Sequence, residues 1–167
     1  SFSPVLQNTI ARELGFNLAY VPFKVERGSV NTAVRGGEAL GIKGFNVTVP
    51  HKIEVMDALC GIDPVAEHIG AVNTLKLTDN GYVGYNTDII GLKKCLEARK
   101  IKIEGKTVVL AGAGGAANSA AMLAGEEKAG QLIIVNRTAK KAERGAKQIG
   151  AEPFVKKRKA CGAILKS

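Results

Sequence analysis

Hydrophobic and polar residues alternate with helical and extended spacings over the first half of the chain. Val5, Leu6, Ile10 and Leu14 recur at intervals that place them on one face of a helix, and Gly15 follows as a stop signal. The pattern predicts helices over residues 4–14, from a cap at Ser29 or Asn31 to residue 40, and over 51–59, 64–70 and 88–98; it predicts strands over 18–25, 45–49, 72–77 and 82–85.

The pattern changes after residue 98. Residues 106–111 read as a strand of the buried kind, and a glycine-rich turn and an alanine-rich helix follow. A second strand over residues 131–135 and a helix over 139–149 complete the start of a parallel α/β domain. We therefore expect an α/β protein with two domains, residues 1–90 and 91–167.

Composition narrows the class of protein. The chain has 167 residues, of which 46% are hydrophobic, so a packed globular protein is expected. No apolar run is long enough to span a membrane. Three widely spaced cysteines, Cys60, Cys95 and Cys161, indicate neither a metal cluster nor a disulfide framework. We expect no metal site, no membrane partner and a location in a reducing cytoplasm.

The formal net charge of +9 raises the alternative of a nucleic-acid-binding module. Much of the excess lies in Lys156-Lys157-Arg158-Lys159, where a solvated surface is the simpler interpretation. Aromatic residues are few and no RNA-binding signature is present. Because an anionic substrate and a phosphorylated cofactor would also favour a positive field, we expect no nucleic-acid partner.

The glycine-rich turn is Gly112-Ala113-Gly114-Gly115-Ala116-Ala117, which follows a predicted strand and opens a helix. Gly112 allows the tight turn, Gly114 lets the backbone approach a pyrophosphate, and the small Ala117 lets helix and strand pack closely. The helix N-terminus offers free N–H groups and a positive dipole to phosphates. This context predicts a dinucleotide site that includes Gly112, Ala113, Gly114, Gly115 and Ala116; the alternative is a plain glycine turn.

The residues after the second strand indicate which dinucleotide is bound. An acidic side chain there would bind the ribose 2′-hydroxyl of NAD, but the chain has Asn136-Arg137-Thr138, followed by Lys141. Guanidinium pairs with phosphate through charge-assisted bidentate hydrogen bonds. The sequence therefore favours NADP over NAD, with an ordinary loop arginine as the alternative reading of Arg137.

Polar residues of the first half are candidates for a second site. In Asn46-Val47-Thr48-Val49-Pro50-His51-Lys52, the side chains of Asn46 and Thr48 share one face of a strand. Lys52 falls in the first turn of the helix predicted over residues 51–59, where a cation opposes the helix dipole. A locally unfavourable charge hints at a function, and a solvated lysine is the alternative.

Other polar residues have ready structural explanations when each is taken singly. Asp88 or Thr87 could cap the helix that follows, and Ser3 before Pro4 is an ordinary helix start. Asn73 could be a polar strand residue. None of these side chains identifies a reaction alone.

Several motifs nevertheless occur in a fixed order along residues 1–150. They are Ser1-Phe2-Ser3-Pro4, Asn46 to Lys52, Gly70-Ala71-Val72-Asn73-Thr74, Gly84-Tyr85-Asn86-Thr87-Asp88, the Gly112 loop and Asn136-Arg137-Thr138. In this order the chain resembles bacterial and archaeal NADP-dependent shikimate dehydrogenases. The resemblance implies an oxidoreductase of aromatic amino acid and chorismate biosynthesis, which interconverts 3-dehydroshikimate and shikimate. It also implies a substrate domain with a mixed sheet, joined to a doubly wound Rossmann domain.

The resemblance also assigns roles to residues. Lys52 and Asp88 would form the catalytic pair, and Ser1 and Ser3 would bind the substrate carboxylate. The substrate's ring hydroxyls would be held by Thr48, Asn73 and Asp88, supported by Asn46 and Thr87. The Gly112 loop would hold the cofactor pyrophosphate. The 2′-phosphate would be held by Asn136, Arg137, Thr138 and Lys141.

The chain departs from the family pattern at both ends. The family's first strand and the second half of the Rossmann domain have no counterpart, so we expect a part of a longer enzyme, acting as a monomer or a homodimer. Two alternatives stay open: a quinate/shikimate paralogue with relaxed cofactor use, and a non-catalytic binding fragment.

Overall fold

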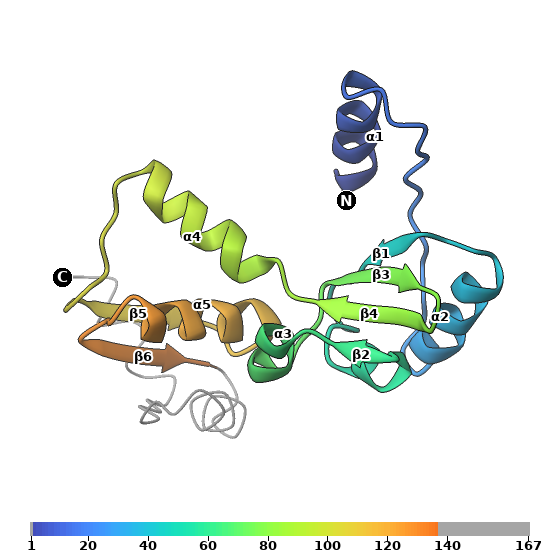
Figure 1. The fold of residues 1–167 in the computed structure, drawn as a ribbon. Helices are drawn as coiled ribbons and strands as arrows, with labels where there is room; N and C mark the ends of the chain where they lie inside the picture. The colour runs from blue at the N-terminus through green and yellow to red at the C-terminus, as the bar shows by residue number, and fades with distance from the viewer. Residues whose placement is uncertain (1, 137–167) are drawn as a thin grey trace.

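A computed structural model describes residues 2–136 and shows two bodies, each built around its own sheet (Figure 1). The helices are α1 (Ser3–Glu13), α2 (Val30–Ala39), the 3₁₀ helix η1 (Glu54–Ala58), α3 (Pro64–Ile69), α4 (Asp88–Ala98) and α5 (Gly115–Glu126). The strands are β1 (Gly44–Asn46), β2 (Gly61–Ile62), β3 (Thr74–Thr78), β4 (Gly81–Tyr85), β5 (Thr107–Ala111) and β6 (Gln131–Val135).

The first body contains a four-stranded sheet with the order β1-β3-β4-β2. β3 pairs antiparallel with both β1 and β4, while β2 runs parallel to β4, so the sheet is mixed, as the resemblance implied. The predicted hairpin is confirmed: β3 and β4 are joined at Thr78 and Gly81, and Gly81 has a φ of 111° that favours glycine. The Thr78 hydroxyl donates to the Gly81 carbonyl at 2.7 Å.

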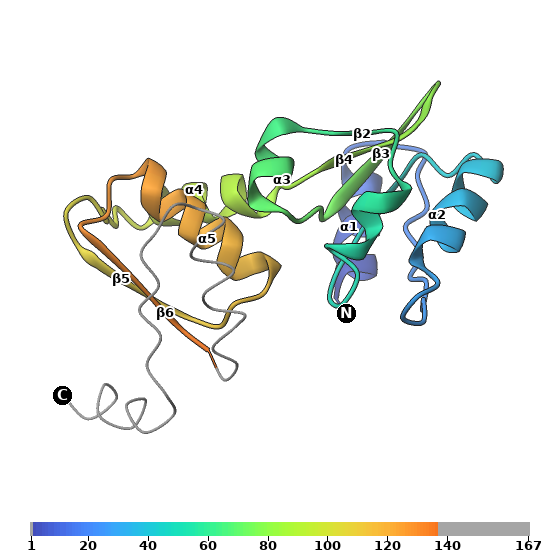
Figure 2. The ribbon, with the colours of Figure 1, turned by 90° about the horizontal axis from the view of Figure 1, so that it is seen from below.

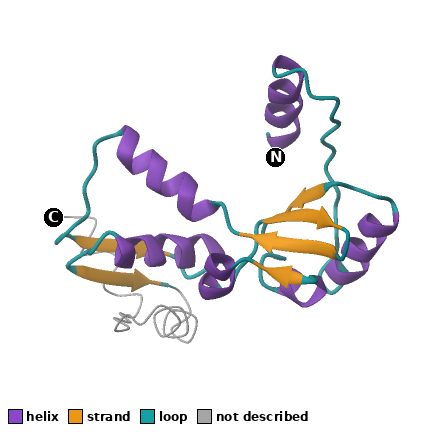
Figure 3. Ribbon diagram, in the orientation of Figure 1, coloured by secondary structure: helices purple, strands orange, loops and turns teal. Residues whose placement is uncertain are grey.

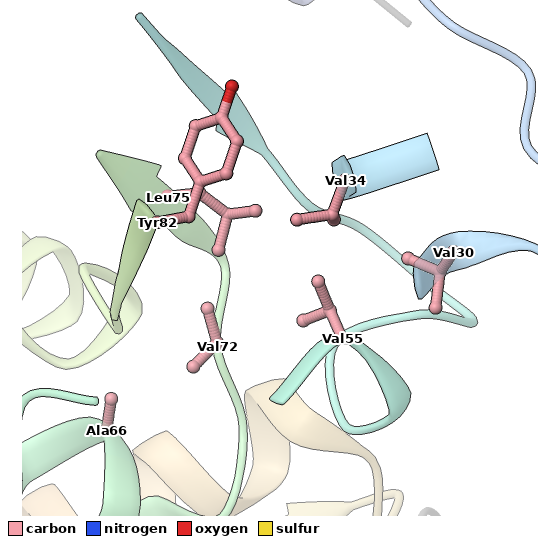
Figure 4. Close-up of a cluster of buried hydrophobic side chains, with 7 residues drawn as sticks. All are labelled: Val30, Val34, Val55, Ala66, Val72, Leu75 and Tyr82. Atoms are coloured by element: carbon pink, nitrogen blue, oxygen red, sulfur yellow. The ribbon is translucent and has the colours of Figure 1, made fainter. Parts of the chain in front are cut away.

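The core of this body lies between the sheet, α2 and η1 (Figure 4). Its buried side chains are Val30 and Val34 of α2, Val55 of η1, Ala66 of α3, Val72, Leu75 of β3 and Tyr82 of β4. The Tyr82 ring packs against the ring of Phe45, and its hydroxyl donates to the carbonyl of Ile42. Val72 lies just before the central strand β3, so this packing fixes the backbone at the end of the sheet where the candidate site is built.

The second body contains β5 and β6, which pair in parallel, with α5 packed against them (Figure 2). The strand–turn–helix–strand order predicted over residues 106–135 is therefore confirmed, and the helix predicted over 139–149 lies outside the described residues. α4 leaves the end of β4 and packs along α5, so it connects the two bodies. Among the described residues, no helix is long and apolar enough to cross a membrane.

The strand predicted over residues 18–25 is wrong: this segment is a loop between α1 and α2 (Figure 3). Its side chains reach β1, where Phe23 packs on Phe45, but no described strand forms a backbone ladder with it. Instead, the side-chain amide of Asn8 donates to the Tyr20 carbonyl and accepts from the Tyr20 N–H, both at 2.8 Å. α1 is confirmed as a helix, but its predicted apolar face is exposed, as at Val5 (69%) and Leu14 (64%).

The predictions for the segment before η1 also need correction. The strand predicted over residues 45–49 is β1, which ends at Asn46, and the helix predicted over 51–59 is only the short η1. Lys52 therefore precedes a helix and does not sit in a first helical turn. The physical reason is that the Lys52 carbonyl accepts the Val72 N–H at 2.8 Å, which ties this residue to the segment just before β3.

Candidate functional site

Lys52 and Asp88 form an ion pair at the end of the four-stranded sheet where β3 begins and β4 ends. The Lys52 ammonium donates to Asp88 Oδ2 at 2.7 Å, and the two side chains are 15% and 31% exposed. Partial burial strengthens such a pair relative to one in bulk water, yet both groups can still be reached by a small molecule. The structure thus brings together the two residues that the resemblance named as catalytic.

Asn73 holds the second oxygen of the carboxylate. Its amide nitrogen donates to Asp88 Oδ1 at 2.8 Å. Its carbonyl oxygen accepts from the Thr74 hydroxyl at 2.8 Å, from the Thr87 N–H at 3.0 Å and from the Thr87 hydroxyl at 3.2 Å. Asn73 is only 8% exposed, so its carbonyl is committed to these protein groups. It orders the site and can offer a ligand only its amide N–H side.

The hydrogen-bonded network continues outward along β1 and β3. Asn46 donates to the Thr74 hydroxyl at 3.5 Å, and its own carbonyl oxygen accepts from the Tyr20 hydroxyl at 3.1 Å. Tyr20 carried no functional signal in the sequence, because the segment around it read as an apolar strand. Among the described residues, its hydroxyl is the outermost group in a series of hydrogen bonds that ends at Lys52.

The remaining predicted substrate residues are placed on other segments. Thr48 is exposed in the loop after β1, and its carbonyl accepts the His51 N–H at 2.9 Å. Ser3 begins α1, which stands apart from the sheet in Figure 1. Ser1 lies outside the described residues. The hydrogen bonds described above therefore unite Asn46, Asn73, Thr87 and Asp88 around Lys52, while Thr48 and Ser3 belong to the neighbouring loop and to α1.

The glycine loop joins β5 to α5 in a geometry that suits a pyrophosphate. Gly112 has a φ of 127°, and its N–H donates to the Val135 carbonyl at 2.8 Å, which fixes the loop to the end of β6. A Cβ added at Gly112 or at Gly114 would meet no atom within 4 Å, so the backbone here is open to a ligand. Gly114 precedes the first turn of α5, where unpaired N–H groups gather. The loop residues Gly112, Ala113, Gly114, Gly115 and Ala116 therefore fit the cofactor that the sequence predicted.

The glycine loop reaches the ion pair through Gly115. A Cβ at Gly115 would lie 3.3 Å from Cδ of Lys52 and 3.4 Å from Cβ of Ala71. The start of α5 thus packs on the aliphatic stem of Lys52. A dinucleotide bound at this loop and a substrate bound at Lys52 would share one site.

Three residues of this region had no predicted role. Asn86 and Ser119 are buried, at 4% and 1% exposure, and Asn118 donates to the Ile69 carbonyl at 3.2 Å. The side-chain carbonyl oxygen of Asn86 accepts the Asp88 N–H at 3.0 Å. An asparagine two residues before a helix start is a signal for this turn, so Asn86 could have been found from sequence. Ser119 and Asn118 give no such signal.

Of the four residues predicted to hold the 2′-phosphate, the structure describes one. Asn136 follows β6 directly and is partly buried. Arg137, Thr138 and Lys141 lie outside the described residues.

Two family matches cover most of the chain. Residues 1–75 match the family described as "Shikimate dehydrogenase substrate binding domain", and residues 95–161 match "Shikimate / quinate 5-dehydrogenase". The chain belongs to the shikimate dehydrogenase family. The resemblance seen in the sequence is thereby confirmed.

Individual relatives agree with this assignment. A shikimate dehydrogenase (NADP(+)) of Methanocaldococcus jannaschii is 46% identical over 157 residues, which are 94% of this chain and 55% of that protein. The shikimate 5-dehydrogenase of Thermus thermophilus, in complex with NADP(H) and shikimate, matches with a TM-score of 0.83 at 27% identity, over 92% of this chain and 58% of that one. The enzyme of Listeria monocytogenes, in complex with shikimate and NAD, matches with a TM-score of 0.86 at 28% identity, over 99% and 60%. The chain spans about half the length of the curated shikimate dehydrogenases it matches.

Proposed function

We propose that this protein is an NADP-dependent oxidoreductase that reduces 3-dehydroshikimate to shikimate, in the pathway to chorismate and the aromatic amino acids. The observation that carries the proposal is the Lys52–Asp88 pair lying directly against the start of α5. The pair bonds at 2.7 Å, and Gly115 of the glycine loop packs on the Lys52 stem. A proton donor and a dinucleotide loop are thus adjacent, which is what carbonyl reduction needs.

The chemistry assigns Lys52 the role of proton donor. Bound NADPH would supply a hydride to the carbonyl carbon of the substrate. As the C=O π bond breaks, the oxygen gains negative charge and takes a proton from the Lys52 ammonium, which regains one from solvent. Asp88 holds the ammonium in place, and each of its carboxylate oxygens has a further lone pair that could accept a substrate hydroxyl.

The other predicted residues complete the proposed site. Thr48, Asn46, Asn73 and Thr87 would support the ring hydroxyls, and Ser1 and Ser3 the carboxylate. Asn73 would act chiefly through Asp88, because its carbonyl oxygen already accepts three hydrogen bonds. Arg137, with Asn136, Thr138 and Lys141, would select NADP. The NADP(H) complex of the Thermus relative supports this choice.

The proposal extends to organisation and location. We propose a domain boundary between residues 90 and 91, inside the first turn of α4, the helix that follows the first sheet. We infer a cytoplasmic protein that acts as a monomer or homodimer; the exposed free cysteines Cys60 and Cys95 are compatible with reducing surroundings.

A spectrophotometric assay tests the function. Purified protein is mixed with each of the two substrates, shikimate and quinate, in combination with each of the two cofactors, NADP⁺ and NAD⁺. The formation of reduced nicotinamide is followed by its absorbance. The proposal predicts the fastest reaction with shikimate and NADP⁺. Comparable rates with quinate would support the alternative suggested by the description "Shikimate / quinate 5-dehydrogenase". Binding of shikimate without turnover in any pairing would overturn the proposal in favour of a non-catalytic fragment.

A further inference from the structure

Helix α5 approaches both members of the Lys52–Asp88 pair from one face. Gly115 and Ser119 are four positions apart on this helix, so they lie on the same side, one turn from each other. Gly115 packs on the Lys52 stem. Ser119, which is 1% exposed, reaches the chain just before Asp88.

Asn86 is the link between Ser119 and Asp88. Its carbonyl oxygen accepts the Asp88 N–H at 3.0 Å, and its amide donates to the Ala71 carbonyl at 2.9 Å. Thr87, the N-cap residue of α4, makes no side-chain cap bond, and the side chain of Asn86 instead accepts the N–H of Asp88, the first residue of the helix. Asn86 thereby fixes the backbone from which the Asp88 carboxylate projects.

The Ser119 hydroxyl connects this corner to α5. Its Oγ lies 3.3 Å from the side-chain carbonyl oxygen of Asn86 and 3.2 Å from the main-chain carbonyl oxygen of Gly115, so its one hydroxyl proton is shared between these two acceptors. The bond to Gly115 is the usual one that a helical serine makes to its own helix. The bond to Asn86 instead crosses from the cofactor helix to the substrate-binding body, beside a catalytic residue.

We propose that the face of α5 formed by Gly115 and Ser119 positions both halves of the catalytic pair, Lys52 directly and Asp88 through Asn86. Gly115, Ser119 and Asn86 are positioning residues in this scheme. The helix whose N-terminus would receive the cofactor pyrophosphate thus also sets the geometry of the proton donor. The kinetic consequence rests on the proposed function, but the positioning of Asp88 does not.

Asn118 offers a matched control. It is the neighbour of Ser119 on α5, and its amide also crosses between the bodies, to the Ile69 carbonyl at 3.2 Å. No described contact joins Asn118 to Lys52, Asp88 or Asn86. Asn118→Ala therefore removes one hydrogen bond from α5 to the end of α3 without changing a contact of Lys52, Asp88 or Asn86.

The test compares Ser119→Ala and Asn118→Ala with the unaltered protein by two measurements. Amide hydrogen exchange at Asp88, followed by NMR, should become about fivefold faster in Ser119→Ala, the effect of one weakened hydrogen bond, and stay unchanged in Asn118→Ala. In the shikimate assay, Ser119→Ala should lower kcat about fivefold and alter its pH profile, with the KM for NADP⁺ unchanged. Asn86→Ala should show both effects more strongly if it folds.

The outcomes separate the two claims. Equal exchange at Asp88 in Ser119→Ala and Asn118→Ala would overturn the positioning role, whatever the activity. Faster exchange in Ser119→Ala alone, in a protein that does not turn over shikimate, would support the positioning role and count against the proposed function. A loss of stability shared by both variants, with no kinetic difference between them, would leave Ser119 a packing residue and refute the inference.

Discussion

The amide of Asn73 donates to the same carboxylate that holds Lys52, at 2.8 Å on Asp88 Oδ1, while Lys52 holds Oδ2 at 2.7 Å. Each oxygen of the Asp88 carboxylate therefore accepts a hydrogen bond, and the two donors come from different parts of the sequence. Asn73 lies just before β3, and Lys52 lies just before η1. The ion pair is fixed by the sheet and does not depend on a mobile surface contact.

Asn73→Ala should destabilise the protein and loosen the Lys52–Asp88 ion pair. The change removes the donor to Asp88 and leaves the Thr87 N–H without its acceptor, which costs about 2–3 kcal/mol. Chemical denaturation measures the loss of stability. The exposed Asn80→Ala in the hairpin turn is the control, and an equal effect of both changes would show that Asn73 has no special place in the site.

Gly115→Ala should slow the reaction while leaving the fold nearly as stable. The new Cβ at 3.3 Å from Cδ of Lys52 makes the lysine stem shift by a few tenths of an ångström, and the displaced ammonium should lower kcat about fivefold, equivalent to about 1 kcal/mol of activation free energy. Gly125→Ala is a matched control on the same helix, since a Cβ there meets nothing within 4 Å. It should raise stability by up to about 1 kcal/mol without affecting kcat. Equal kcat values for Gly115→Ala and Gly125→Ala would show that the contact of Gly115 with Lys52 has no effect on the reaction.

Gly112→Ala should weaken cofactor binding. A φ of 127° is strained for alanine, so the loop must change its backbone or lose stability. We expect the Kd for NADP⁺, measured by fluorescence titration, to rise about tenfold, equivalent to about 1.4 kcal/mol. Gly36→Ala in α2, where a Cβ has open space, should leave the Kd unchanged. Unaltered NADP⁺ binding in Gly112→Ala would place the cofactor elsewhere.

The sequence predicted the parts of the fold whose signals are local. Asp63 was expected to start a helix, and its carboxylate accepts the N–H groups of Val65 and Ala66. The Gly112 loop was recognised because strand, turn and helix follow one another directly. The pairing of Lys52 with Asp88 came from the family resemblance, since no local rule links residues that far apart.

The errors arose where tertiary contacts override local pattern. Residues 18–25 are mostly apolar and read as a strand, but no described strand forms a ladder with them, and the Asn8 side chain takes the Tyr20 backbone groups instead. Lys52 was expected inside a helix, yet its carbonyl bonds to Val72. The contact of Gly115 with Lys52 depends on how the two bodies meet, which no spacing in the sequence reveals.

Tyr82 should make stability fall at alkaline pH. Burial, with Glu38 nearby, raises the pKa of Tyr82 above its usual value of 10.0. The folded state thus disfavours the phenolate, so this contribution to stability is complete below about pH 10 and is lost as pH rises toward the folded pKa. In Tyr82→Phe, which also loses the hydrogen bond to Ile42, the free energy of unfolding should fall less steeply over this range. The measurement is thermal unfolding from about pH 9 to about pH 11, about one unit either side of the free tyrosine pKa. An equally steep fall of the free energy of unfolding with pH in Tyr82→Phe and in the unaltered protein would contradict the role of Tyr82.

The most direct measurement is the turnover of shikimate by Lys52→Ala, made together with its affinity for shikimate by calorimetry. The proton-donor role predicts that kcat falls about 1,000-fold while the Kd for shikimate changes less than about tenfold. Lys76→Ala, at an exposed lysine of β3, serves as the control and should retain full activity. A Lys52→Ala protein that keeps its kcat, or that loses binding in step with turnover, would contradict the assignment of Lys52 as the group that delivers the proton.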